Sequence, residues 1–173
     1  MTRVARFMRV SPARFDEDWT EAFPGASIPD PPALPARATA GSAGYDFFAP
    51  AAFRLDPGES VKIPTGVRAR IAPGWVLMLF PRSGLGFKYR LQLNNTVGVV
   101  DSDYFGARNE GHIFIKLTNA GDKPLSVEAG EAFAQGVFLP FGLTEDDDAE
   151  GERVGGFGST GVQTNIVSVQ PGR

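Results

Sequence analysis

The chain has 173 residues, a net charge of −3, one histidine and no cysteine, and this length suits one domain with its own hydrophobic core. The lack of cysteine excludes disulfides and thiolate metal sites and fits a reducing, cytoplasmic compartment, while a single histidine, His112, excludes a metal site built from several histidines. The acidic charge argues against stable nucleic-acid binding, and the longest apolar stretch, residues 75–80, is far too short to span a membrane.

A short helix is predicted near the N-terminus, over residues 11–23. Ser11 is a good N-cap, Pro12 suits the first helical position, and acidic residues follow early in the helix. Three aromatic side chains recur at every fourth position and give the helix one apolar face (Phe15, Trp19, Phe23). Residues 24–35 contain five prolines and predict an extended linker, so residues 1–35 form an N-terminal addition.

The remainder predicts an all-β domain, because glycine and proline punctuate a series of short apolar segments. Residues 75–80 are continuously apolar and are expected to form a strand buried on both faces. The other predicted strands are residues 60–71, 112–118, 125–127 and 133–139. An acidic, apolar-poor stretch opens the segment 144–173, which is expected to be a solvated linker and a flexible glycine-rich arm of a single domain spanning residues 1–173.

Four short segments carry polar groups where the β pattern is interrupted. Arg82, Ser83 and Gly84 follow the apolar strand directly and offer a cation, a hydroxyl and backbone N–H groups, which suit anionic oxygens. A plain surface turn with a solvated arginine would have the same composition. The other three segments carry an acid, an apolar hairpin with Asn and Asp at its ends, and an amide (Asp46, residues 94–104, Gln135). Asn and Asp in such a hairpin also serve simply to form turns.

The stretch RVGGFGSTG, residues 153–161, contains a formal G-x-G-x-x-G match. A dinucleotide site needs a helix opening at the glycines and an acidic residue about 20 positions later. Too little chain follows Gly161 for that, and taken alone a glycine-rich end predicts only a flexible tail.

Together these five segments resemble, in order, the five motifs of the trimeric dUTPases (deoxyuridine triphosphate nucleotidohydrolases). The segments are AGYDFFA (43–49), PRSGLGFK (81–88), NTVGVVDSDYFG (95–106), GEAFAQ (130–135) and RVGGFGSTG (153–161). The resemblance implies a jelly-roll-like, distorted β-barrel subunit and a homotrimer with sites shared between subunits. It also implies Mg²⁺-assisted hydrolysis of dUTP to dUMP and pyrophosphate, which keeps uracil out of DNA and supplies dUMP.

The resemblance further implies a role for each matching residue. Asp101 would activate the attacking water, with Asp103 the weaker candidate, and Asp46 would hold Mg²⁺ through a water. Phosphate contacts are implied for Arg82, Ser83, Gly84 and Gln135. Uracil contacts are implied for Asn95, Gly98, Val99 and Val100, and a ring under the deoxyribose is implied for Tyr104. In the tail, nucleotide contacts are implied for Arg153, Phe157, Gly158, Ser159 and Thr160, and closure of this tail would expel water.

Some features depart from the family pattern. The tail has one residue fewer between Arg153 and GGFG than the commonest spacing, and residues 105–111 form a longer stretch than in minimal members, which suggests an extended hairpin beside the sugar pocket. His112 follows directly and is interpreted as structural. Two alternatives stay open: a dCTP deaminase of the same fold, for which no glutamate base is suitably placed, and a non-enzymatic binding module with a regulatory protein partner.

Overall fold

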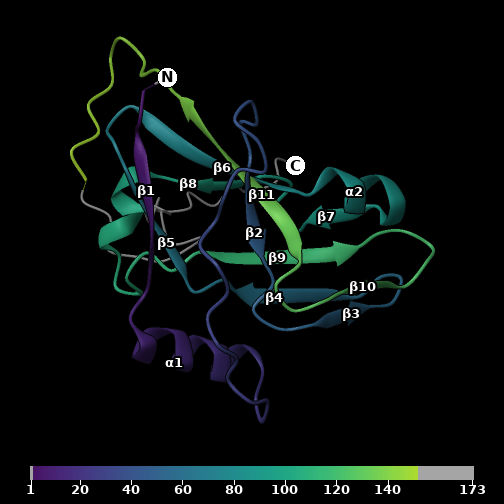
Figure 1. Cartoon of the computed structure of the whole chain (residues 1–173). Helices are drawn as coiled ribbons and strands as arrows, with labels where there is room; N and C mark the ends of the chain where they lie inside the picture. The colour runs from purple at the N-terminus through teal and green to yellow at the C-terminus, as the bar shows by residue number, and fades with distance from the viewer. Residues whose placement is uncertain (1, 152–173) are drawn as a thin grey trace, which may run out of the picture.

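The computed structural model describes residues 2–151 (Figure 1). The predicted nucleotide contacts of the tail, from Arg153 to Thr160, lie outside the described residues. The elements follow in chain order: β1 (Ala5–Arg9), α1 (Pro12–Ala22), β2 (Tyr45–Phe48), β3 (Phe53–Leu55), β4 (Ser60–Pro64), β5 (Val67–Ile71), β6 (Trp75–Pro81), α2 (Ser83–Tyr89), β7 (Leu91–Leu93), β8 (Gly98–Val100), the 3-10 helix η1 (Ser102–Gly106), β9 (Phe114–Asn119), β10 (Leu125–Val127) and β11 (Ala132–Pro140).

The described strands form four antiparallel sheets. The largest has the order β2-β11-β6-β8, the second has the order β4-β9-β7, and two-stranded sheets pair β1 with β5 and β10 with β3. This arrangement confirms the predicted all-β, jelly-roll-like fold. The strands of residues 2–151 form separate sheets and do not close into a complete barrel.

One hydrophobic core joins the two larger sheets. Leu77 and Leu79 from β6 and Ile115 and Leu117 from β9 belong to it, and all four are no more than 1% exposed. Burying each such side chain contributes about 1.5–3 kcal/mol to folding. Their neighbours on β6, such as Met78, are only half-buried, so β6 is not buried on both faces within one chain. The expectation of a doubly buried strand is therefore wrong for the single subunit.

The predicted strand over residues 60–71 is two strands in different sheets. The chain turns at Thr65–Gly66, where Gly66 has φ +72°, a left-handed conformation that favours glycine. β4 on one side pairs with β9, and β5 on the other pairs with β1. The alternation of apolar residues continues through the turn, which explains why the pattern alone predicts one strand.

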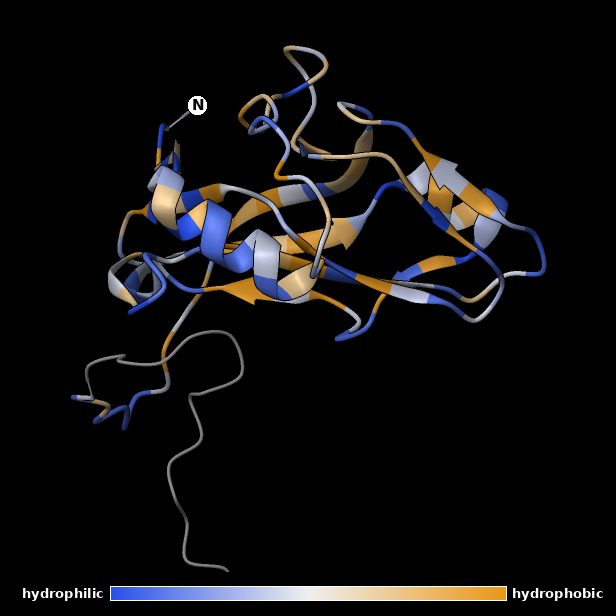
Figure 2. Ribbon diagram, turned by 90° about the horizontal axis from the view of Figure 1, so that it is seen from below, coloured by the Kyte–Doolittle hydropathy of each residue, from blue (hydrophilic) through white to orange (hydrophobic). Residues whose placement is uncertain are grey.

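The N-terminal residues fold onto the domain. The Ser11 hydroxyl accepts a hydrogen bond from the backbone N–H of Arg14 at 3.2 Å, which confirms Ser11 as the N-cap of α1, although no acidic residue lies in the first turn. Phe15 and Trp19 are buried in a small second cluster between α1 and the domain. Figure 2 shows α1 lying across the strands, with hydrophilic and hydrophobic residues both present along its ribbon. No helix within residues 2–151 is long and apolar enough to cross a bilayer.

Candidate functional site

Three predicted phosphate-side residues lie together on neighbouring strands. Gln135 on β11 pairs with Asp46 on β2 and with Phe80 on β6, and Arg82 directly follows β6. The Arg82 Nε lies 3.6 Å from the Asp46 Oδ1, and the arginine side chain is 44% exposed. Because the pair is open to solvent, its attraction is modest. The guanidinium therefore stays available to an anionic ligand while the carboxylate limits its orientation.

A glycine in the first motif makes room for the amide of the fourth. A Cβ built on Gly44 would lie 2.7 Å from the Oε1 of Gln135, so the glutamine side chain occupies the space that any other residue would fill. The Gln135 Nε2 donates a hydrogen bond to the carbonyl of Pro81 at 3.4 Å. The amide is thus held beside the end of β6, where α2 begins with Ser83 and Gly84, both exposed.

The remaining predicted residues lie along β8 and the turns at its two ends. Asn95 and Val99 are exposed, Asp101 is half-buried, and Gly98 and Val100 are buried. β8 pairs with β6, whereas β7 pairs with β9, so the expected hairpin is wrong: the chain crosses from one sheet to the other between β7 and β8. Gly98 is required by packing, because a Cβ there would lie 2.9 Å from the Cβ of Leu79.

Tyr104 is held inside the domain by its hydroxyl. Its side chain belongs to the core and the residue is 1% exposed. The hydroxyl donates a hydrogen bond to the carbonyl of His112 at 2.6 Å and accepts one from the Nδ2 of Asn109 at 2.7 Å. The stretch 105–111, expected as an extended hairpin, instead completes η1 at Gly106 and then folds back, so that Asn109 and Gly111 lie against Tyr104.

The two groups of predicted residues lie toward opposite ends of one strand pair. Arg82 follows the end of β6, and Asp101 follows the end of β8, which runs antiparallel to it. Val100 pairs with Leu77, so Arg82 and Asp101 lie six residues apart along the pair, which is roughly 20 Å at the usual rise of a strand. Figure 1 shows α2 on the opposite side of the molecule from the end of β8.

Sequence patterns did not reveal the contacts of His112. Its Nδ1 lies 2.5 Å from the Oδ2 of Asp18 on α1, and its Nε2 accepts a hydrogen bond from the backbone N–H of Gly66 at 2.8 Å. The ring is therefore neutral, with its proton on Nδ1. Burial lowers the pKa of His112, although the hydrogen bond and charge of Asp18 act in the opposite direction. The partners come from 46 and 94 residues away along the chain, so no local pattern links them.

The all-β subunit thus carries Arg82, Gln135 and Asp46 at one end of its largest sheet and Asp101 at the other. The profile of the dUTPase family matches residues 30–161. The deoxyuridine 5′-triphosphate nucleotidohydrolase of Lactococcus lactis is 44% identical over 132 residues, which covers 75% of this chain and 88% of the relative. The chain therefore belongs to the dUTPase family.

Solved structures agree with this assignment. The dUTPase of Streptococcus mutans is 37% identical, has a TM-score of 0.61, and covers 80% of this chain and 98% of its own. A dUTPase mutant from phage phi11 of Staphylococcus aureus, described with a structural Mg(II) ion, is 20% identical and shares the fold with a TM-score of 0.61 over 86% of this chain and 98% of its own. The family match begins after α1, which leaves the N-terminal helix as a feature of this chain outside it.

Proposed function

We propose that the chain hydrolyses dUTP to dUMP and pyrophosphate, at sites that copies of the chain build together. Membership of the dUTPase family supports the reaction, since its curated relatives are named deoxyuridine 5′-triphosphate nucleotidohydrolases. The observation that carries the proposal of shared sites is the division of the motif residues between the two ends of the β6–β8 pair.

The direction of a bound nucleotide favours shared sites. Uracil would contact Asn95 and the backbone of residues 98–100. The deoxyribose would lie over Tyr104, a core residue that is 1% exposed and lies beyond Asp101 along the chain. A nucleotide placed in this way on one copy would extend its phosphates past the end of β8, away from the Arg82 of the same copy. The phosphate-binding arginine is then supplied by a neighbouring copy. Repeating this head-to-tail contact around a three-fold axis gives the proposed homotrimer with three equivalent sites.

The phosphate side would neutralise the charge of the substrate. Arg82 donates to phosphate oxygens, Ser83 and Gly84 offer a hydroxyl and N–H groups, and Gln135 adds an amide donor. Asp46 keeps the guanidinium oriented through the 3.6 Å contact. Donors placed in advance around developing charge are commonly the largest catalytic contribution in phosphoryl transfer.

The donor set is suited to Mg²⁺ held mainly by water and substrate. Within residues 2–151 no three His, Cys, Asp or Glu side chains gather into a metal cluster, so protein ligands alone would not complete an octahedral shell there. Mg²⁺ usually keeps several waters and takes phosphate oxygens. Asp46, half-buried beside Arg82, would hold one of those waters. When bound, the ion would add positive charge to the phosphate chain.

The chemical step is assigned to Asp101. Its carboxylate would accept a proton from a water that attacks the α-phosphorus, with pyrophosphate as the leaving group. The tail residues, which lie outside the described part of the chain, would complete the site: Arg153 on the terminal phosphate, Phe157 stacked on uracil, and Gly158, Ser159 and Thr160 near the phosphates. Such a closure excludes water from the site.

A nucleotide panel tests the proposed function. Pyrophosphate release is measured with all common nucleoside triphosphates, with and without Mg²⁺. We expect release from dUTP, a strong dependence on Mg²⁺, and little release from UTP, dTTP or dCTP. Ammonia release from dCTP would instead identify the deaminase alternative, and no turnover of any nucleotide would favour a binding module.

A further inference from the structure

The N-terminal helix α1 contacts the segment of the chain that holds Tyr104, the residue proposed to contact the deoxyribose. We infer that Asp18 on α1 is a positioning residue, which acts through His112 to hold Tyr104 in place beneath the deoxyribose. The inference rests on the proposed function, in which Tyr104 contacts the sugar. It concerns a helix that lies before the residues matched by the family model.

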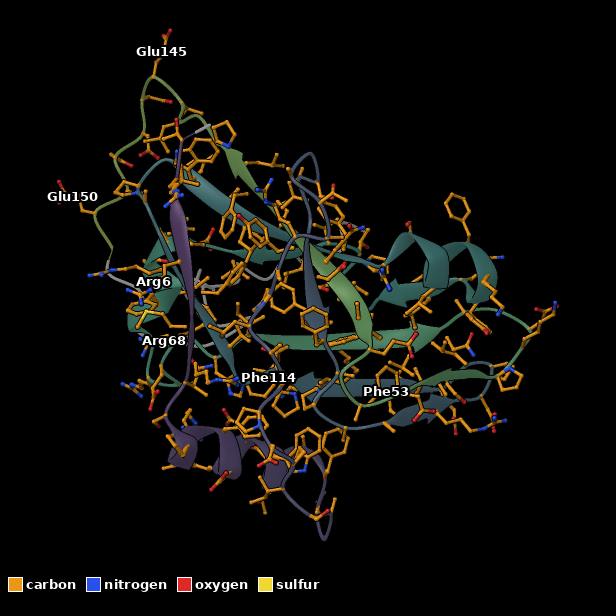
Figure 3. All side chains as sticks on the ribbon, in the orientation of Figure 1. Arg6, Phe53, Arg68, Phe114, Glu145 and Glu150 are labelled. Atoms are coloured by element: carbon orange, nitrogen blue, oxygen red, sulfur yellow. The ribbon has the colours of Figure 1, made fainter. Side chains whose placement is uncertain are left out.

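The first link runs through the histidine ring. Asp18 contacts the Nδ1 of His112 at 2.5 Å, and the N–H of Gly66 donates to the Nε2 at 2.8 Å. The ring also neighbours Phe15, on α1, at a centroid distance of 6.3 Å and Phe114 at 4.7 Å. With both nitrogens engaged, the ring has one orientation. Phe114, at the start of β9, is labelled in Figure 3 on the side of the molecule nearer α1.

The second link joins the backbone of His112 to Tyr104. The carbonyl of His112 accepts the tyrosine hydroxyl at 2.6 Å. Gly111, with φ +69°, passes so close to η1 that a Cβ on it would lie 2.7 Å from the carbonyl oxygen of Tyr104. A movement of residues 111–112 would therefore displace Tyr104 at its backbone as well as at its hydroxyl.

A parallel contact holds the same stretch from the start of the helix. Both the backbone N–H and the hydroxyl of Ser11 donate to the carboxylate of Glu110, at 2.8 and 2.6 Å. Arg68 on β5 donates to the carbonyl of Phe105 at 2.7 Å and lies over its ring at 3.7 Å. Figure 3 labels Arg68 on the side of the molecule where α1 begins. Residues 105–112 are thus held at both ends, by Arg68 at one end and at the other by Asp18 on α1 and its N-cap Ser11.

The consequence is a change in sugar recognition rather than in the chemical step. Asp18 is 7% exposed at its side chain and also pairs with Arg14 at 3.0 Å, so it is held rigidly in turn. Its removal frees the histidine ring and the turn behind Tyr104. The contact with the deoxyribose then loosens, while Asp101, on the other side of η1, keeps its position at the end of β8.

Steady-state kinetics of Asp18→Ala with dUTP and UTP test the inference, measured well below the unfolding temperature. We expect KM for dUTP to rise about tenfold, less than the ~100-fold that a 1 Å misplacement can cost, with kcat within about twofold of the parent and a reduced preference for dUTP over UTP. Asp18→Asn keeps an acceptor oxygen for the Nδ1–H and should restore most of the loss. Asp16→Ala, an exposed change of the same charge on the same helix, should behave as the parent.

Hydrogen–deuterium exchange of residues 102–112 supplies a readout that does not depend on the substrate. We expect faster exchange there in Asp18→Ala and parent-like exchange in Asp16→Ala. Unchanged exchange, or an unchanged KM and dUTP preference in a folded Asp18→Ala protein, would overturn the inference and leave α1 as a stabilising helix only. If Asp18→Ala does not fold, the same measurements are made on Asp18→Leu and Asp18→Asn. Parent-like values in Asp18→Leu would count against the inference. An unchanged dUTP preference in Tyr104→Ala would instead overturn the sugar assignment, in the proposed function and here alike.

Discussion

The Nε2 of His112 accepts a hydrogen bond from the backbone N–H of Gly66 at 2.8 Å. If this nitrogen were protonated, two N–H donors would face each other and this hydrogen bond would be lost. Asp18, Arg14 and Glu110 are the charged groups around the ring, and burial is the largest cause of its lowered pKa. A histidine whose pKa is lower in the folded state than in the unfolded state binds its proton more readily when unfolded. Stability is therefore full above the unfolded value of about 6.5 and falls as the pH drops below it.

We accordingly predict that the free energy of unfolding falls below pH ~6.5, by up to about 1.4 kcal/mol per pH unit. Urea denaturation at a series of pH values measures this slope. Because His112 is the only histidine in the sequence, the same series on His112→Gln should lose the slope between about pH 5.5 and 6.5. A slope that survives in this variant would mean that another group causes it.

Gly44→Ala should impair substrate binding with little loss of stability. The new Cβ would meet the Oε1 of Gln135 at 2.7 Å, and that oxygen ends a flexible side chain that can swing away. We expect KM for dUTP to rise several-fold and stability to change by less than about 1 kcal/mol. Gly41→Ala is the matched control, because a Cβ there has no neighbour within 4 Å. Equal KM values for the two variants would contradict the role in phosphate binding that is assigned to the Gln135 amide.

Gly98→Ala should act on folding. Here the new Cβ would lie 2.9 Å from the Cβ and 3.1 Å from the Cδ1 of Leu79, a core residue that is 1% exposed. Forcing an extra methyl group into such packing costs about 1–3 kcal/mol. Chemical denaturation should show this loss, and Gly142→Ala, with open space around its position, should show none. A Gly98→Ala protein as stable as the parent would mean that β8 shifts away from β6 at little cost.

Asp101→Asn should abolish turnover and preserve binding. An amide cannot accept the proton of the attacking water, and loss of a general base typically costs 10²–10⁴-fold in rate. Calorimetry with a non-hydrolysable dUTP analogue should give an affinity close to that of the parent. Asp103→Asn, at the exposed neighbouring acid, should lose far less activity. Hydrolysis by Asp101→Asn at near the parent rate would contradict the base assignment.

The parts of the fold and site that sequence patterns predict are those encoded locally. Ser11 and the spacing of the aromatic residues after it predict α1. The alternation of apolar residues and the turns on either side predict strands such as residues 125–127. β1 was missed because arginines interrupt its apolar residues; only its pairing with β5 makes it a strand. The individual site residues stay predictions, each made because it belongs to a short motif with recognisable chemistry.

Such local patterns do not predict how residues distant in the sequence are placed relative to one another. The separation of Arg82 from Asp101 follows from β8 lying antiparallel beside β6, and strand order is not encoded in apolar periodicity. The contact between Asp18 and His112 joins residues 94 positions apart, so its formation depends on tertiary packing. Both relations carry proposals made above, one for sites shared between copies of the chain and one for the positioning of Tyr104.

Complementation between two inactive variants tests the shared site most directly. Arg82→Ala and Asp101→Asn are co-expressed with different tags, and complexes that carry both tags are isolated. If the arginine and the aspartate of one site come from different copies, every trimer that carries both variants has one intact pair among its three interfaces, and hence about a third of the parent rate of dUTP hydrolysis. Mixed complexes no more active than either variant alone would contradict the account, because each site would then draw both residues from one chain.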